Sequence, residues 1–258
     1  MPNQHLRSFK SIAFITGMLL LGSAQAHHVW IEQPAVGQKT GNATFFFGEF
    51  GGNLREASPG LLDKFPQPVA FRLSAKGEQA LPVSKTAGGF AIAARAAKGE
   101  SIVAEEPAYP ISERKDGDTT LRSLYHPAAR LVVGFSKQDP KLTLDLVPTG
   151  NAGKDGVEVQ AFYKGQPLPK AKVEVITASG WSQTHYSDEA GKLRVQMPWR
   201  GTYVLELSHS DKNPGERAAA SGPEKFDRAS YVTSLTLMQA TGIATLPAPP
   251  AAAPNKMN

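Results

Sequence analysis

The chain has 258 residues, a formal net charge of +5 and no cysteine. The absence of cysteine excludes disulfides, thiolate metal sites, iron–sulfur clusters and thiol catalysis. Lysine and arginine are spread along the chain without the dense runs of nucleic-acid-binding surfaces, so we expect no nucleic-acid partner.

The first 26 residues have the three-part organisation of a cleavable signal peptide. Arg7 and Lys10 supply positive charge, Ser11–Gly22 is largely apolar, and small residues follow at Ala24 and Ala26. The apolar run of about a dozen residues is shorter than the roughly 20 residues that a membrane-spanning helix needs. We therefore expect cleavage after Ala26, with cleavage after Ala24 as the alternative, and a periplasmic mature chain without a membrane span.

The mature chain contains many short segments rich in β-branched and aromatic residues, separated by Gly, Pro, Asn and Asp. This spacing is typical of β-sandwiches and predicts an all-β fold. The predicted strands are Val29–Gln33, Ala43–Phe47, Val69–Leu73, Gly89–Ala94, Ser101–Ala104, Arg130–Phe135, Leu142–Val147, Val157–Tyr163, Lys172–Thr177, Ser182–Tyr186, Lys192–Met197, Thr202–Ser208 and Tyr231–Met238.

A stretch of turn-forming residues, Pro148–Gly156, divides these strands into two groups. We expect two immunoglobulin-like or transthyretin-like β-sandwich units, at 27–148 and 156–240, joined by a linker or a long inter-strand loop. The last segment, 241–258, is rich in Pro and Ala, and we expect it to be disordered.

Two histidines follow the predicted cleavage site directly. Cleavage after Ala26 would make His27 the first residue, and its α-amine, with a pKa of about 8, could chelate a metal ion together with its own imidazole. His28 would supply a further nitrogen, and nitrogen ligands suit copper, nickel, cobalt and zinc. Cleavage after Ala24 would instead place His27 third from a free amine, where it could complete a four-nitrogen set around Cu(II) or Ni(II).

Among the other histidines of the mature chain, His209 and His126 are the best candidates for further ligands. His126 lies at a predicted turn and His209 at the end of a predicted strand, positions that expose side chains. Neither residue can be placed next to His27 from sequence alone. The nucleophile-elbow, H-E-x-x-H and P-loop motifs are absent from the sequence, so we expect no enzymatic activity.

Several motifs in order along the chain resemble an exported β-sandwich family that is associated with nickel and cobalt uptake. The second half is also similar to the transthyretin-like or carboxypeptidase-regulatory-like module, which is chiefly structural. The motifs are Ala26-His27-His28-Val29-Trp30-Ile31-Glu32, Phe47-Gly48-Glu49-Phe50, Leu54-Arg55-Glu56-Ala57-Ser58-Pro59-Gly60, Leu144-Asp145-Leu146-Val147-Pro148, Gly165-Gln166-Pro167-Leu168-Pro169, Ser187-Asp188-Glu189-Ala190-Gly191, Gly201-Thr202-Tyr203 and Ser230-Tyr231-Val232-Thr233.

The resemblance implies a periplasmic protein that binds nickel or cobalt, with copper as an alternative, and passes the ion to a membrane transporter. The metal would be held by His27 and His28, with His209 or His126 completing the site. Two other hypotheses stay open. One is a module that binds an envelope protein or glycan without metal, and the other is an oxidative enzyme with copper in an N-terminal histidine brace.

Overall fold

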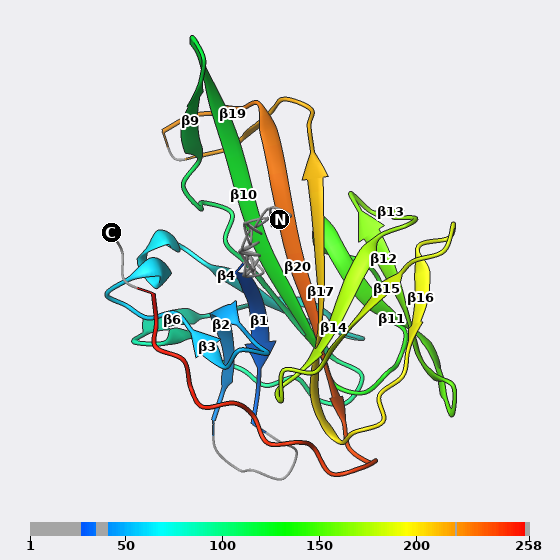
Figure 1. The fold of residues 1–258 in the computed structure, drawn as a ribbon. Coiled ribbons are helices and arrows are strands. Elements are labelled where there is room, and N and C mark those ends of the chain that lie inside the picture. The colour runs from blue at the N-terminus through cyan, green and yellow to red at the C-terminus, as the bar shows by residue number, and fades with distance from the viewer. Residues whose placement is uncertain (1–26, 35–40, 220, 256–258) are drawn as a thin grey trace, which may run out of the picture.

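The computed structural model describes residues 27–34, 41–219 and 221–255. The predicted signal peptide lies outside these residues. The prediction of an all-β fold is confirmed, because strands dominate and the helical structure in the described part is one 3-10 turn, η1 (Leu61–Lys64) (Figure 1).

The largest sheet has nine strands and takes them from both halves of the sequence. Its order is β15-β14-β17-β20-β10-β8-β4-β5, with β9 paired to β10. Strands β10 and β20 run parallel in the middle of the sheet, and the other neighbours are antiparallel. The strands are β4 (Val69–Ser74), β5 (Gly77–Leu81), β8 (Ser101–Glu105), β9 (Ser112–Asp116), β10 (Thr119–Val132), β14 (Lys172–Thr177), β15 (Ser182–Tyr186), β17 (Gly201–Asp211) and β20 (Arg228–Gln239).

Three smaller sheets complete the fold. A five-stranded sheet comes from the first half of the chain, with the order β1-β2-β7-β6 and β3 paired to β2. A four-stranded sheet has the order β11-β12-β13 with β16 paired to β12, and β18 pairs with β19. The strands are β1 (His28–Glu32), β2 (Ala43–Glu49), β3 (Leu54–Arg55), β6 (Val83–Thr86), β7 (Gly89–Ile92), β11 (Leu144–Gly153), β12 (Gly156–Tyr163), β13 (Gln166–Pro167), β16 (Lys192–Val195), β18 (Gly215–Arg217) and β19 (Glu224–Phe226).

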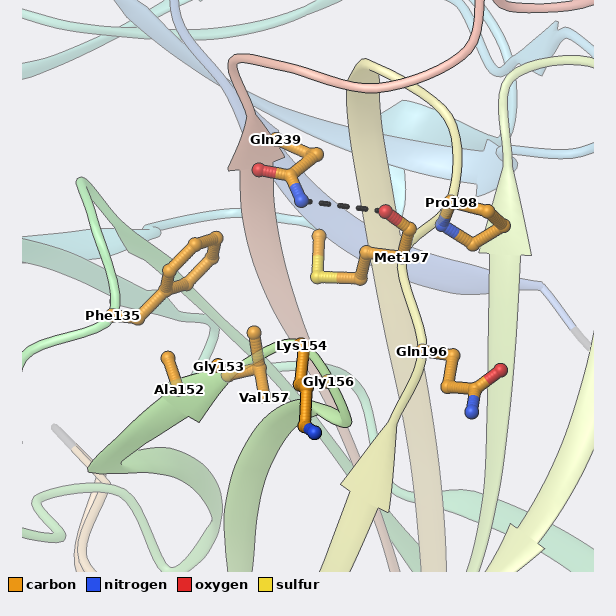
Figure 2. Close-up of a pocket in the computed structure, with 10 residues that line it drawn as sticks. All are labelled: Phe135, Ala152, Gly153, Lys154, Gly156, Val157, Gln196, Met197, Pro198 and Gln239. Atoms are coloured by element: carbon orange, nitrogen blue, oxygen red, sulfur yellow. Dashed lines mark hydrogen bonds between the residues drawn. The ribbon is translucent and has the colours of Figure 1, made fainter.

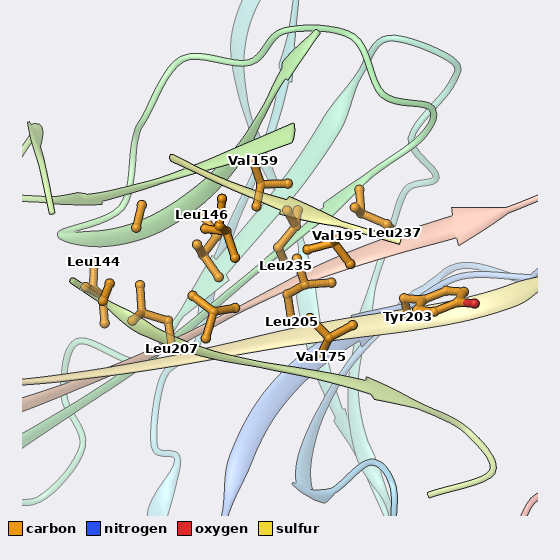
Figure 3. Packing of buried hydrophobic residues seen from close by; sticks show 14 of the residues in the cluster. Leu144, Leu146, Val159, Val175, Val195, Tyr203, Leu205, Leu207, Leu235 and Leu237 are labelled. Carbon is orange, nitrogen blue, oxygen red and sulfur yellow. The ribbon is translucent and has the colours of Figure 1, made fainter. Parts of the chain in front are cut away.

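The nine-stranded sheet carries a hydrophobic core on each face. Successive side chains of a strand point to opposite faces. In β10, Leu131 packs with residues of the five-stranded sheet, whereas its neighbour Val132 packs with residues of the four-stranded sheet. Figure 3 shows the second of these cores, where Leu146 and Val159 meet Leu235.

A buried ion pair ties the four-stranded sheet to the nine-stranded one. Arg130 of β10 and Asp145 of β11 have no exposed side-chain surface, and two guanidinium nitrogens donate to the two carboxylate oxygens at 3.0 and 2.6 Å. Such a bidentate pair fixes orientation as well as distance. The pair therefore holds β11 against β10 in one arrangement.

The two predicted units share the nine-stranded sheet, since β4, β5 and β8–β10 come from 27–148 and β14, β15, β17 and β20 from 156–240. The predicted linker at 148–156 forms part of the β11–β12 hairpin, whose register shifts between Pro148 and Ala152. Gly, Asn and Asp suit a bulged hairpin as well as a linker, so the composition did not separate the two.

The C-terminal segment, for which we predicted disorder, is described as far as Asn255 and runs beside β3 (Figure 1). Ala252 forms a bridge with Leu54, and its N–H donates to the carbonyl oxygen of Asn53 at 3.1 Å. The chain end thus returns to the first strands of the fold.

Candidate metal centre at the N-terminus

Three residues that are far apart in the sequence meet just before β1. His27 precedes β1, Glu56 follows β3, and Asn255 ends the described C-terminal segment. Strands β1 and β3 both pair with β2, which brings their ends together around Phe47. The ring of His27 lies 5.1 Å from the ring of Phe47, and the N–H of Glu56 donates to the Phe47 carbonyl oxygen.

Short polar contacts join the three side chains. His27 Nε2 lies 2.6 Å from Glu56 Oε1, and the Glu56 side chain is fully buried whereas that of His27 is 23% exposed. Asn255 donates its backbone N–H to Glu56 Oε2 at 3.0 Å and its Nδ2–H to Oε1 at 2.6 Å. Its Nδ2 is also 3.1 Å from His27 Nε2, so the two nitrogens share Oε1 as their acceptor.

These contacts determine which nitrogen of His27 is free. Glu56 accepts two N–H groups of Asn255, and with the carboxylate as the acceptor toward His27 as well, Nε2 carries the proton and donates it to Glu56. In the neutral ring the lone pair is then on Nδ1. This nitrogen is the one close enough along the side chain to chelate a metal ion together with the α-amine that the predicted cleavage after Ala26 would give this residue. Histidines that bind metals commonly donate their other N–H to a carboxylate in this way.

His28 lies on the other side of β1. It is 7% exposed, its Nε2 is 3.7 Å from Glu206 Oε2, and its Nδ1 has no hydrogen-bond partner. Burial and then the nearby His27 lower the pKa of His28 to about 4. Burial, followed by the charges of Glu174 and Glu49, raises the pKa of Glu206 to about 8. At neutral pH the imidazole is therefore uncharged.

His126 and His209 lie on the opposite face of the nine-stranded sheet. Both are in register with Tyr231 of β20, one on β10 and one on β17. His126 Nε2 is 2.8 Å from Glu105, and the ring of His209 is 4.3 Å from that of Tyr163. Alternation along β17 points Glu206 toward β1 and His209 away from it.

The four predicted ligands are thus divided among three places. His27 and His126 each have a carboxylate within hydrogen-bond distance of Nε2, and of these two only His27 would also carry an α-amine after the predicted cleavage. Within residues 27–34, 41–219 and 221–255, no group of three or more His, Asp or Glu side chains could hold a metal ion. A metal at His27 would therefore depend on the α-amine, and water or another molecule would complete its coordination.

A cavity of about 520 Å³, shown in Figure 2, is lined by residues of β11, β12 and β20 and of the segment after β16. Phe135, Val157 and Met197 give it apolar walls, and Gln239 donates to the carbonyl oxygen of Met197 at 3.3 Å. None of the predicted ligands lines this cavity.

Sequence reasoning did not identify two residues of the centre. Glu56 was noted only as part of the motif Leu54–Gly60, because nothing local indicates that its carboxylate is buried. Asn255 lies in a Pro/Ala-rich segment with no local signal at all. Both enter the site through tertiary contacts that span 29 and 199 residues.

No family model, curated protein or solved structure matches this chain. In the part of the chain that the structure describes, no helix is long and apolar enough to cross a membrane.

Proposed function

We propose that the mature chain begins at His27 and binds a divalent transition metal in the periplasm, in support of nickel or cobalt uptake. The metal is cargo in this proposal, and a membrane transporter receives it. The α-amine and Nδ1 of His27 hold the ion, and Glu56 holds the ring. This assignment agrees with the family that the sequence motifs resemble.

The observation that carries the proposal is the 2.6 Å contact between His27 Nε2 and the fully buried Glu56 carboxylate. A carboxylate behind a histidine sets the tautomer and makes the opposite nitrogen a stronger ligand, commonly worth 10- to 100-fold in metal affinity. The free Nδ1 is on the side of the ring from which the amine of the same residue can be reached. The His27 ring is therefore already in the tautomer that metal binding through Nδ1 requires before the ion binds.

The small number of protein ligands supports transport rather than permanent storage. An amine and one imidazole leave most coordination positions of Ni²⁺ or Co²⁺ open to water or to a receiving protein. A copper histidine brace would need a second histidine beside His27. His28 contacts Glu206 instead, and His126 and His209 lie beyond the sheet. This arrangement favours metal binding over an oxidative enzyme.

The test is calorimetric titration of the mature chain, starting at His27, with Ni²⁺, Co²⁺ and Cu²⁺ at pH 7.5. We expect one ion per chain, and we expect His27→Ala or acetylation of the α-amine to weaken binding at least about tenfold. Binding should also weaken below about pH 6, because the amine and the imidazole must both be deprotonated.

His185→Ala is the matched control and should leave the affinity unchanged, because His185 lies on β15 at the end of the nine-stranded sheet, whereas β1 belongs to the five-stranded sheet. Equal affinity with and without a blocked amine would show that the site is elsewhere. A wild-type chain that binds none of the three ions would contradict the function and favour a binding module without metal.

A further inference from the structure

The C-terminal segment 249–255 forms a strap across the first strands of the fold. Asn53 Nδ2 donates to the Pro249 carbonyl oxygen at 2.9 Å, and Ala252 pairs with Leu54 three residues further on. The strap then reaches Asn255, beside Glu56 and His27. Figure 1 shows this red segment passing along β3.

Asn255 supplies two of the three hydrogen bonds that the Glu56 carboxylate receives. A carboxylate without exposed surface needs such donors, because a buried charge that lacks partners is costly. With Asn255 in place, Glu56 is held so that one lone pair of Oε1 faces His27 Nε2. Without the Asn255 side chain, Oε1 has the histidine as its remaining donor, and its direction is no longer fixed.

We propose that Asn255 is a positioning residue of the N-terminal metal site, and that docking of the C-terminal strap sets the affinity of this site for its ion. The inference rests on the proposed function. A docked strap keeps Glu56 behind His27 and so keeps the proton on Nε2. A released strap frees both Glu56 and the His27 ring, which lowers the affinity. Metal release to a partner would then be favoured by displacement of the strap.

The experiment compares the mature wild-type chain with Asn255→Ala and Asn255→Asp. Asn255→Ala removes the Nδ2 donor but keeps the backbone N–H. Asn255→Asp keeps the size but places a second carboxylate against Glu56. One readout is the affinity for Ni²⁺, and the other is the tautomer of His27 in the metal-free protein, read from the ¹⁵N chemical shifts of the ring.

We expect the wild-type ring to carry its proton on Nε2 and Asn255→Ala to give a mixture of tautomers. The Ni²⁺ affinity should fall about tenfold in Asn255→Ala and further in Asn255→Asp, the range found for outer carboxylate partners of metal-bound histidines. Asn151→Ala is the control, because it removes a comparable amide contact, Nδ2 to Glu158 at 2.9 Å, elsewhere in the fold. It should change neither readout.

Two failures can be told apart. If the wild-type chain binds Ni²⁺ and Asn255→Ala matches it in affinity and tautomer, the positioning role is wrong and the proposed function stands. If the wild-type chain binds no metal, the proposed function fails and the role of the strap in affinity fails with it.

Discussion

His28 and Glu206 form a buried pair in which the acid, and not the base, holds the proton at neutral pH. Burial is the main cause for both, since it disfavours either charged form. The nearby Glu174 and Glu49 push the Glu206 pKa further up, and His27 pushes the His28 pKa further down. The separation of 3.7 Å is too long for the hydrogen bond that an ionised pair would make.

As the pH rises, the titrations of these two residues change the free energy of unfolding in opposite directions. The pKa of Glu206 is about 8 in the folded state against 4.5 as the ordinary value, so its contribution is lost as the pH rises from 4.5 through 8. The pKa of His28 is about 4 against 6.5, so stability is gained as the pH rises from 4 through 6.5. Of these two groups, only Glu206 acts between pH 6.5 and 8.

Glu206→Gln should therefore abolish the decrease in the free energy of unfolding that ionisation of Glu206 causes as the pH rises. Between pH 5.5 and pH 8.5 we expect the free energy of unfolding of the variant to rise relative to that of the wild type by roughly 1–3 kcal/mol, because only the wild type must ionise a buried carboxyl over this range. Urea unfolding at pH 5.5, 7.0 and 8.5 in the presence of a chelator measures this. Glu216→Gln, on the exposed side of β18, is the control. Parallel curves for wild type and Glu206→Gln would refute the buried-proton account.

At the scale of elements, most strands with a buried face could be predicted and most exposed strands could not, although the exposed strand β15 was predicted. Each of the thirteen predicted strands overlaps a strand of the structure. The prediction missed the short strands β3, β5, β6, β13, β18 and β19. It also missed β9, which is exposed throughout, and the first part of β10, which pairs with it. These segments form a ladder beyond the core, where backbone hydrogen bonds and not burial hold them. Alternating hydrophobicity reports burial alone, so it carries no signal for them.

The same distinction holds for the candidate site. His27 was proposed as a ligand because its chemistry would follow from its position next to the predicted cleavage site. Glu56 and Asn255 were not, because their roles depend on burial and on a strap that returns from the other end of the chain. Patterns within a short window report local periodicity, and a three-way contact of this kind has none.

Two hairpin glycines offer a test of how tightly the elements are packed. Gly77 and Gly156 have the same φ of +104°, at the β4–β5 and β11–β12 turns. A Cβ at Gly156 would lie 2.3 Å from the Val195 carbonyl oxygen, whereas one at Gly77 would meet nothing within 4 Å. Gly77→Ala should thus cost only the conformational strain, about 1–2 kcal/mol.

Gly156→Ala should lower the free energy of unfolding by the same conformational strain as Gly77→Ala and, because β16 must be displaced, by about 1–3 kcal/mol more. Urea unfolding of both variants under one condition provides the comparison. Equal losses would mean that the β11–β12 turn moves freely away from β16, and that the four-stranded sheet is looser than its contacts suggest.

At the scale of the whole molecule, the parallel pairing of β10 with β20 joins the two halves of the sequence. Ten residue pairs connect them, from Ser123 with Arg228 to Val132 with Leu237. The first half would expose β10, and the second half β20, if the other were absent. Arg130 and Asp145 would also lose their fixed arrangement if β10 were disturbed. Each half thus depends on the other to complete its central sheet.

The chain should consequently unfold in one cooperative transition, with equal calorimetric and van't Hoff enthalpies. Leu235→Ala, in the β20 core, should cost 2–5 kcal/mol. Because the sheet is shared, hydrogen exchange should show the same loss of protection in β2 of the first half as in β12 of the second. Leu62→Ala, buried in η1, provides the mirror experiment from the first half. Two calorimetric transitions, or a loss confined to the mutated half, would contradict this coupling and would show that the units predicted at 27–148 and 156–240 unfold separately.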